Sequence, residues 1–287
     1  MMHYQIITDS ACDLPKAMLQ QLNVSTIPLR VMFRGESLED SVGEGLQEIY
    51  AGLRNGEATS TSAINPTGWA SVMEPVLQQG QDVLVLAFSS GLSATYQSAV
   101  IAAEELQETY PDRKIRVVDT LCAALGQGLL VWYACKQRDA GLSLDELTQW
   151  VENNKLHLCH WVTVNDLMHL KRGGRISATT AVVGTMLQIK PIIHVNDEGK
   201  LINVGKARGR KAAMQILVDK MKQLGEGFDN HTAFICHGDC LEEAQMLQSM
   251  VLQQTDTKEV FVGNLGAVIG SHAGPGTLAL FFLGKHR

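Results

Sequence analysis

The 287-residue sequence lacks the features that mark several large classes of protein. No apolar run approaches the roughly 20 residues that a membrane-spanning helix needs, so we expect no stable membrane insertion. The first ten residues, MMHYQIITDS, lack a basic region followed by an apolar core, so we expect no signal peptide and a cytoplasmic location. The formal net charge of −6 lacks the positive excess that general nucleic-acid binding needs, so we expect no nucleic-acid partner.

The six cysteines lack the spacing of a disulfide framework or of a zinc site. They are scattered along a long chain without a secretion signal, which argues against a set of disulfides. Two segments, HLCH at 157–160 and CHGDC at 236–240, resemble metal-binding sequences at first sight. Neither contains a C-x-x-C pair or a second half at zinc-finger spacing, so we expect no metal.

Three motifs of nucleotide and acyl chemistry are also absent. The sequence has no G-x-x-x-x-G-K-[ST] and no G-x-G-x-x-G, which excludes a P-loop and a dinucleotide fingerprint. It has no G-x-S-x-G nucleophile elbow either. We therefore expect no cofactor and no ATP site.

The chain does contain a repeated order of apolar strand, polar turn and helix. In the first half, strands are expected at 4–7, 27–33, 83–88 and 115–118, a loop at 35–45, and helices at 46–53, 67–77, 94–106 and 123–138. This order is typical of a parallel α/β sheet with sites at the carboxyl ends of its strands. After residue 154 the pattern is mixed, with a hairpin signal around residues 196–199. We predict a two-domain α/β fold: an N-terminal parallel-sheet domain over 1–155 and a C-terminal mixed α/β domain over 156–287.

Two hydroxyl-rich turns are the candidate site. The turn SSGLS at 89–93 ends an apolar strand and precedes a helix, so its hydroxyls, its backbone N–H groups and the helix dipole suit a carboxylate or a single phosphate. We interpret Ser93 as a binding residue, and the alternative is a helix N-cap. Thr61 and Ser62 lie in a second such turn, TSTSAINP at 59–66, which should emerge at the same sheet edge. Their alternative role is a local turn or cap.

Glycine-flanked His272 and Arg172 are further candidates. His272 lies in the turn SHAGPG at 271–276, whose Gly-Pro-Gly implies a backbone that something approaches closely. A structural hydrogen-bonding role is the alternative. Arg172 precedes Gly173-Gly174 in a segment with two more cations, Lys171 and Arg175, for which a solvated face is the alternative.

A second basic cluster lies at the start of an expected helix over 208–224. It consists of Lys206, Arg208, Arg210 and Lys211. Cations are unfavourable at a helix N-terminus, which indicates an acidic partner or a phosphate. The alternative is an exposed basic face without a partner.

Several motifs occur in a fixed order along the chain. They are IITDSACDLP at the start, TSTSAINP, SSGLSATYQSA at 89–99, LKRGGRIS at 170–177, KPI at 190–192 and GSHAGPGTLALFF near the end. Over nearly the whole length, the chain resembles the DegV family of bacterial fatty-acid-binding proteins. The resemblance implies a two-domain α/β fold with a long-chain fatty acid buried between the domains.

The same resemblance implies roles for single residues. Thr61 and Ser93 would hold the carboxylate, with His272 and Arg172 near the head group. The protein would be a lipid-binding carrier without its own ATP site, and some members present the acid to a separate fatty-acid kinase. The sequence departs from the family pattern at TSAINP, usually TSQPSP, and at Ala94, usually glycine.

Alternative readings of the function and of the acyl pocket stay open. A Ser-dependent hydrolase or a small-molecule kinase would use the same anion turn, but the absent elbow and P-loop favour the carrier. One wall of an acyl slot is expected from residues 181–189, AVVGTMLQI, with Met186 as an adaptable member. An ordinary core segment is the alternative.

Overall fold

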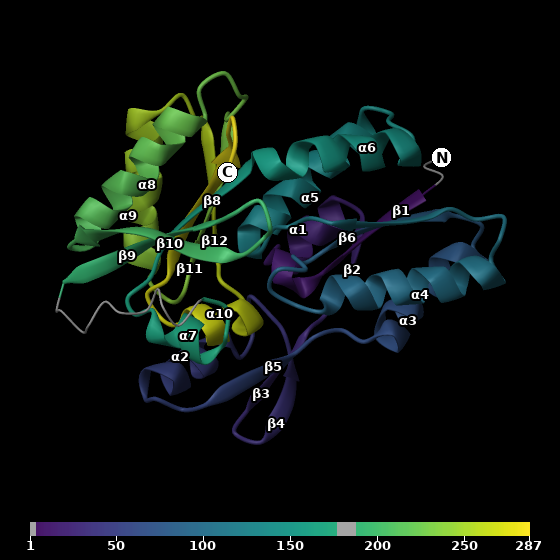
Figure 1. Cartoon of the computed structure of the whole chain (residues 1–287), viewed down its shortest axis with the longest axis horizontal. Coiled ribbons are helices and arrows are strands. Elements are labelled where there is room, and N and C mark those ends of the chain that lie inside the picture. The colour runs from purple at the N-terminus through teal and green to yellow at the C-terminus, as the bar shows by residue number, and fades with distance from the viewer. Residues whose placement is uncertain (1–3, 177–187) are drawn as a thin grey trace.

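The computed structural model of the protein describes residues 4–176 and 188–287. Its strands form three sheets, with helices packed around them (Figure 1). The prediction of an α/β fold with a parallel N-terminal sheet and a mixed C-terminal sheet in two domains is confirmed.

The first sheet is parallel and lies between two layers of helices. Its order is β2 (Val24–Ile27), β1 (Tyr4–Asp9), β6 (Asp82–Ala87) and β7 (Ile115–Asp119). On one face Val83 and Val85 pack with Trp69 of α3 (Pro66–Gln78), beside α4 (Thr95–Thr109). On the other, Leu84 and Leu86 pack with α5 (Ala124–Asp139) and α6 (Leu144–Asn154). Burial on both faces explains why the central strand β6 is an almost continuous apolar run.

The second sheet is antiparallel and was not predicted. It consists of β4 (Glu36–Glu39), β3 (Arg30–Phe33) and β5 (Thr59–Ser62), and it packs near α2 (Leu46–Arg54). The expected strand 27–33 is therefore two strands, because the chain leaves the first sheet at Pro28, which has no N–H for a ladder. The expected loop 35–45 contains β4, and the expected turn 59–66 begins as β5.

The third sheet is mixed and belongs to the C-terminal half. Its order is β10 (Leu201–Arg208), β9 (Ile189–Val195), β8 (Leu158–Thr163), β13 (Leu278–Leu283), β11 (Thr232–His237) and β12 (Glu259–Asn264). Helices α8 (Arg210–Leu224) and α9 (Leu241–Gln254) pack on one face, and α5 contacts the other. The hairpin expected around residues 196–199 joins β9 to β10.

Helix α6 was not predicted, and the helices not yet named are short. Ser143 and Glu146 form a capping box at the start of α6, a signal that the sequence contains. The short helices are η1 (Ser10–Cys12), α1 (Lys16–Gln21), η2 (Lys155–His157), α7 (Met168–Arg172) and α10 (Ala267–Ala273). Helix α10 contacts α7, α2, β3 and β5, so a C-terminal element packs against the second sheet. The domain boundary at residue 155 stays a prediction.

Candidate functional site

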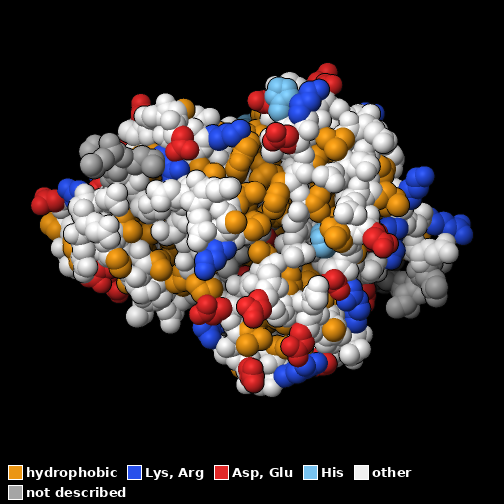
Figure 2. Space-filling model, turned by 180° about the vertical axis from the view of Figure 1, so that it is seen from behind, with side chains coloured by type: hydrophobic (Ala, Val, Ile, Leu, Met, Phe, Trp, Pro, Cys, Tyr) orange, Lys and Arg blue, Asp and Glu red, His pale blue; other side chains and the backbone are white. Residues whose placement is uncertain are grey.

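A cavity of about 270 Å³ lies between the third sheet and the N-terminal sheets. Most of the residues around it are aliphatic or aromatic, and they come from both halves of the chain; among them are Leu29, Phe88, Leu92, Val162, Ile193, Leu265, Ile269, Ala279 and Phe281. Figure 2 shows hydrophobic side chains along the middle of one face of the molecule. An apolar cavity with a few polar groups is the usual form of a small-molecule site.

Thr61 and His272 meet at this cavity, although 211 positions separate them in the chain. Thr61 lies on β5, and its Oγ1 is 2.8 Å from Nε2 of His272. His272 lies on α10 and not in the expected turn, which is a correction of the sequence-based prediction. Helix α10 continues through His272 because its hydrogen-bond pattern extends to the N–H of Gly274, which donates to the carbonyl of Gly270. The helix ends there because Gly274 has a positive φ.

His272 is held in its neutral form. Burial and the charge of Arg175 lower the pKa of His272 to about 4, so the ring is uncharged at neutral pH. Its Nδ1 is buried without a partner among the described residues, and a Cβ on Gly173 would lie only 2.2 Å from that atom. In the tautomer that has its proton on Nε2, the ring donates to Thr61 and leaves the hydroxyl proton of Thr61 free for a ligand.

Of the three serines in the loop at 89–93, only Ser93 lines the cavity. Ser93 and Ser62 both line the cavity, Ser62 at an exposed position. Ser93 Oγ lies 2.8 Å from Thr95 Oγ1 and accepts the Thr95 N–H at 3.2 Å, but the N-cap of α4 is Ala94, which has no side-chain cap. The expectation that backbone N–H groups of residues 90–93 converge on an anion is wrong. Those groups donate to Ser89 and to Asp119 within the protein.

Arg175, and not Arg172, lies at the cavity. Arg172 is exposed and does not line it, whereas Arg175 is half-buried and lines it. The Arg175 guanidinium donates from Nε to the carbonyl of Leu92 at 3.3 Å and from Nη1 to the carbonyl of Gly173. Gly174, at φ +71°, turns the chain between the two arginines. The sequence contains all three cations of this segment but no signal that separates them.

Two buried carboxyl groups anchor the start of α10, the helix that carries His272. Asp13 Oδ1 accepts the N–H of Gly266 at 3.1 Å, and Asp40 Oδ1 accepts the N–H of Val268 at 2.9 Å. Acceptor oxygens at these positions satisfy N–H groups that a helix N-terminus leaves without a partner. The sequence motif that contains Asp13 therefore supports the site from a distance, without lining the cavity.

We predict that the free energy of unfolding depends on pH through the Asp40 carboxyl. Burial raises its pKa from 3.8 to about 6, so between these values the folded protein keeps a proton that the unfolded chain has released. The contribution of Asp40 is therefore present below about pH 4 and is lost as the pH rises through 6. The predicted quantity is the free energy of unfolding of the wild type minus that of Asp40→Asn. This difference should be larger at pH 4.5 than at pH 7.5. Urea denaturation of both proteins at both pH values measures this difference. The titration of the histidines contributes equally to both proteins and therefore cancels. A difference that does not change with pH would contradict the prediction.

Of the second basic cluster, only the Arg210 side chain has partners among the described residues. Arg210 forms an ion pair with Glu243 at 2.7 Å and donates to the carbonyl of Gly276 at 2.7 Å, so it is not free for an acidic partner. Lys206 and Arg208 lie on β10 and not at the helix start, because α8 begins at Arg210. Residues 181–187 of the expected acyl wall lie outside the described residues.

Within residues 4–176 and 188–287, no group of three His, Cys, Asp or Glu side chains is arranged to hold a metal ion. None of the helices described there is long and apolar enough to span a membrane.

The family model and the curated relatives that match the chain name the same family. The profile described as an uncharacterised protein of the DegV family matches residues 3–285. A DegV domain-containing protein of Clostridium perfringens (strain 13 / Type A) is 45% identical over 286 residues, 99% of this chain and 98% of that protein. Another from Lactococcus lactis subsp. lactis (strain IL1403) is 36% identical over 288 residues, 99% of each chain.

Solved structures resemble the whole fold. A DegV family protein from Thermus thermophilus, described by its fatty-acid binding, has a TM-score of 0.89 at 33% identity and covers 99% of this chain and 100% of that one. A stearic acid-binding protein from Eubacterium ventriosum ATCC 27560 has a TM-score of 0.88 at 27% identity, with 98% of each chain covered. From the match over nearly all of its length, the chain belongs to the DegV family.

Proposed function

We propose that this protein binds a long-chain fatty acid, with the tail in the cavity and the carboxylate at Thr61 and Ser93. The observation that carries the proposal is the division of the cavity into a polar mouth and an apolar interior. Thr61, Ser93, Arg175 and His272 are half-buried, whereas Ile193, Ala279 and Phe281 are buried. The fatty-acid binding of the structural relatives supports the same reading.

The mouth offers the donors that a carboxylate needs. A carboxylate removed from water without partners is strongly unfavourable, and hydrogen bonds from hydroxyl and charged groups offset that cost. Thr61 donates its hydroxyl proton when His272 supplies Nε2–H, and the Arg175 guanidinium adds positive charge nearby. We propose Arg175 for the role that the resemblance suggested for Arg172. Ser62 and His272 complete the proposed set, Ser62 at the rim and His272 behind Thr61.

The interior would supply most of the affinity. At ~0.8 kcal/mol for each buried methylene, a sixteen-carbon chain gains on the order of 10 kcal/mol before the costs of ordering it. Val162, Ile193 and Phe281 are three of the side chains that would surround it.

A hydrolase is the second candidate, because the hydroxyl of Thr61 lies 2.8 Å from a histidine. At a pKa of about 4, however, His272 is a weak base at neutral pH. Ser93 bonds to Thr95, and no histidine contacts it among the described residues. A carrier without turnover is therefore the better reading, and an esterase assay on the purified protein tests the alternative.

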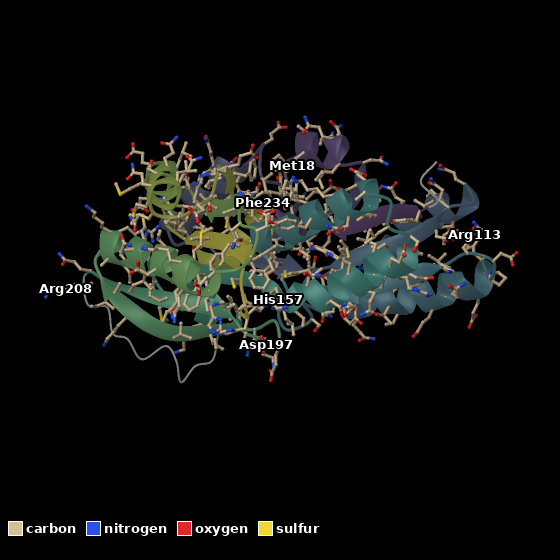
Figure 3. The ribbon with its side chains drawn as sticks, turned by 90° about the horizontal axis from the view of Figure 1, so that it is seen from above. Met18, Arg113, His157, Asp197, Arg208 and Phe234 are labelled. Atoms are coloured by element: carbon tan, nitrogen blue, oxygen red, sulfur yellow. The ribbon has the colours of Figure 1, made fainter. Side chains whose placement is uncertain are left out.

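Presentation of the bound acid to a separate kinase is the proposed partnership. We place the docking surface for an acidic partner at Lys206, Arg208 and Lys211, which are exposed and form no ion pair with the described residues. Figure 3 shows Arg208 pointing away from the body of the molecule at one end.

Charge reversal tests that docking surface. The double variant Lys206→Glu/Arg208→Glu should weaken a complex with a cognate fatty-acid kinase at least tenfold, because each reversal replaces attraction to acidic groups with repulsion. Affinity is measured by surface plasmon resonance, with Lys222→Glu on α8 as the control. Fatty-acid binding should not change. If the kinase acts equally well on the double variant, the three cations are only a solvated face.

The binding proposal is tested on the protein as purified. Mass spectrometry of organic extracts from protein prepared without detergent should identify long-chain fatty acids in near-stoichiometric amount. Extracts without such acids, from protein that also takes up no added hexadecanoate, would overturn it.

A further inference from the structure

The deep wall of the cavity contains an unexpected polar residue, His160. It lies on β8 beside Phe281 of β13, and the two rings make an edge-to-face contact with centroids 5.2 Å apart. His160 is only 2% exposed, whereas Ser62 at the mouth is exposed. A buried imidazole among aliphatic side chains is costly unless both of its nitrogens have partners.

Both nitrogens of His160 do have partners within the protein. Nε2 accepts the N–H of Ala123 at 3.3 Å, and Nδ1 donates to the carbonyl of Leu158 at 3.0 Å. Burial and the charge of Arg287 lower the pKa of His160 well below its ordinary value, so the ring is neutral. Toward the cavity it therefore presents carbon edges, although its side chain is polar.

Thr277, another polar residue of the cavity lining, also has its hydroxyl proton engaged within the protein. The single hydroxyl proton of Thr277 is shared between the carbonyls of Ala273 and Gly274, at 3.0 and 2.8 Å. Behind the wall there is no free space, because a Cβ on Gly126 would lie 2.2 Å from His160 Nε2 and 2.8 Å from Phe281 Cδ1. The start of α5 therefore closes the cavity at His160.

We infer that the wall formed by His160, Phe281 and Ala279 restricts the ligand to acids whose far end is an unsubstituted hydrocarbon chain. The inference rests on the proposed function, because it concerns the end of the fatty acid opposite the carboxylate. A terminal hydroxyl beside this wall would lose its water, and both nitrogens of His160 are already engaged within the protein. Leaving a buried polar group without a partner weakens binding by about tenfold to a hundredfold.

The test compares three acids by isothermal titration calorimetry on the wild-type protein. 16-Hydroxyhexadecanoic acid should bind about tenfold to a hundredfold more weakly than hexadecanoic acid. 2-Hydroxyhexadecanoic acid carries its hydroxyl beside the carboxylate, at the polar mouth, and should bind within about threefold of hexadecanoic acid. Equal binding of the 16-hydroxy acid and hexadecanoic acid overturns the inference and leaves the proposed function standing. If hexadecanoic acid itself does not bind, the proposed function fails.

Two variants connect the effect to the wall. His160→Ala frees the Ala123 N–H as a donor for a terminal hydroxyl, so the discrimination against the 16-hydroxy acid should fall at least fivefold. Ala279→Val adds two methyl groups at a strand position that accepts β-branched side chains, and it should favour dodecanoic over hexadecanoic acid at least tenfold relative to the wild type. The second variant keeps the test valid if the first fails to fold. Unchanged ratios in the folded variants contradict the assignment of the wall.

Discussion

Thr61→Ala and Ser93→Ala should each weaken fatty-acid binding about tenfold to a hundredfold, because a hydrogen bond to a charged group contributes roughly 1.5–3 kcal/mol. Thr61 Oγ1 lies 2.8 Å from Nε2 of His272, Ser93 lies in the loop before α4, and both residues line the cavity. The double variant should be less than additive, since both hydroxyls act on one carboxylate. Titration calorimetry with hexadecanoate measures all three proteins.

Neighbouring hydroxyls provide matched controls for these variants. Ser60→Ala changes the exposed face of β5, and Ser90→Ala changes an exposed position of the same serine loop, so both should bind like the wild type. The melting temperatures of the apo proteins should differ little for Thr61→Ala, whose hydroxyl has only one described partner, His272. Unchanged affinity in both Thr61→Ala and Ser93→Ala would show that these hydroxyls are only structural.

Arg287→Ala should lower the free energy of unfolding by about 3 kcal/mol, the largest expected effect on stability. The Arg287 side chain is buried and donates to the carbonyls of Leu121, Lys155 and Leu158 at 2.6, 2.7 and 3.1 Å. It also reaches the carbonyl of Asn196 in the β9–β10 turn at 3.2 Å. One guanidinium thus joins segments from both halves of the chain, and its loss leaves several carbonyl groups without this donor.

A second cation near the same end of the chain is the control for Arg287. Lys285 pairs with Glu226 at 2.8 Å, but the side chains are 49% and 78% exposed, so Lys285→Ala should cost less than about 1 kcal/mol. Urea denaturation of the two variants and the wild type gives the comparison. If Arg287→Ala is no more destabilising than Lys285→Ala, the guanidinium does not hold these segments together.

The sequence was sufficient for the elements whose packing is reflected in a simple pattern. Strand β6 is buried along nearly its whole length and therefore appears as the apolar run 83–88. The hairpin of β9 and β10 has a turn signal, and Thr61 and Ser93 stand out as hydroxyls beside turn residues. In these cases the local residues determine the local structure.

The parts that failed depend on partners far away in the chain. Residues 59–62 contain only threonine and serine, so they resemble a turn, and they become β5 only because β3 pairs with them. Arg210 resembles an exposed cation until Glu243, 33 positions later, lies beside it. The role of His160 in the cavity wall was not predicted, because its partner, the N–H of Ala123, lies 37 positions earlier. Such tertiary contacts leave no periodic signal in the sequence.

Native mass spectrometry of delipidated protein with added hexadecanoate tests the central claim most directly. The wild type should gain the mass of one hexadecanoate per chain, and the Thr61→Ala/Ser93→Ala variant should show much less of the complex at the same concentration. Ser60→Ala/Ser90→Ala should behave like the wild type. Wild-type protein that stays entirely ligand-free across the titration would contradict the assignment of the cavity as a fatty-acid site.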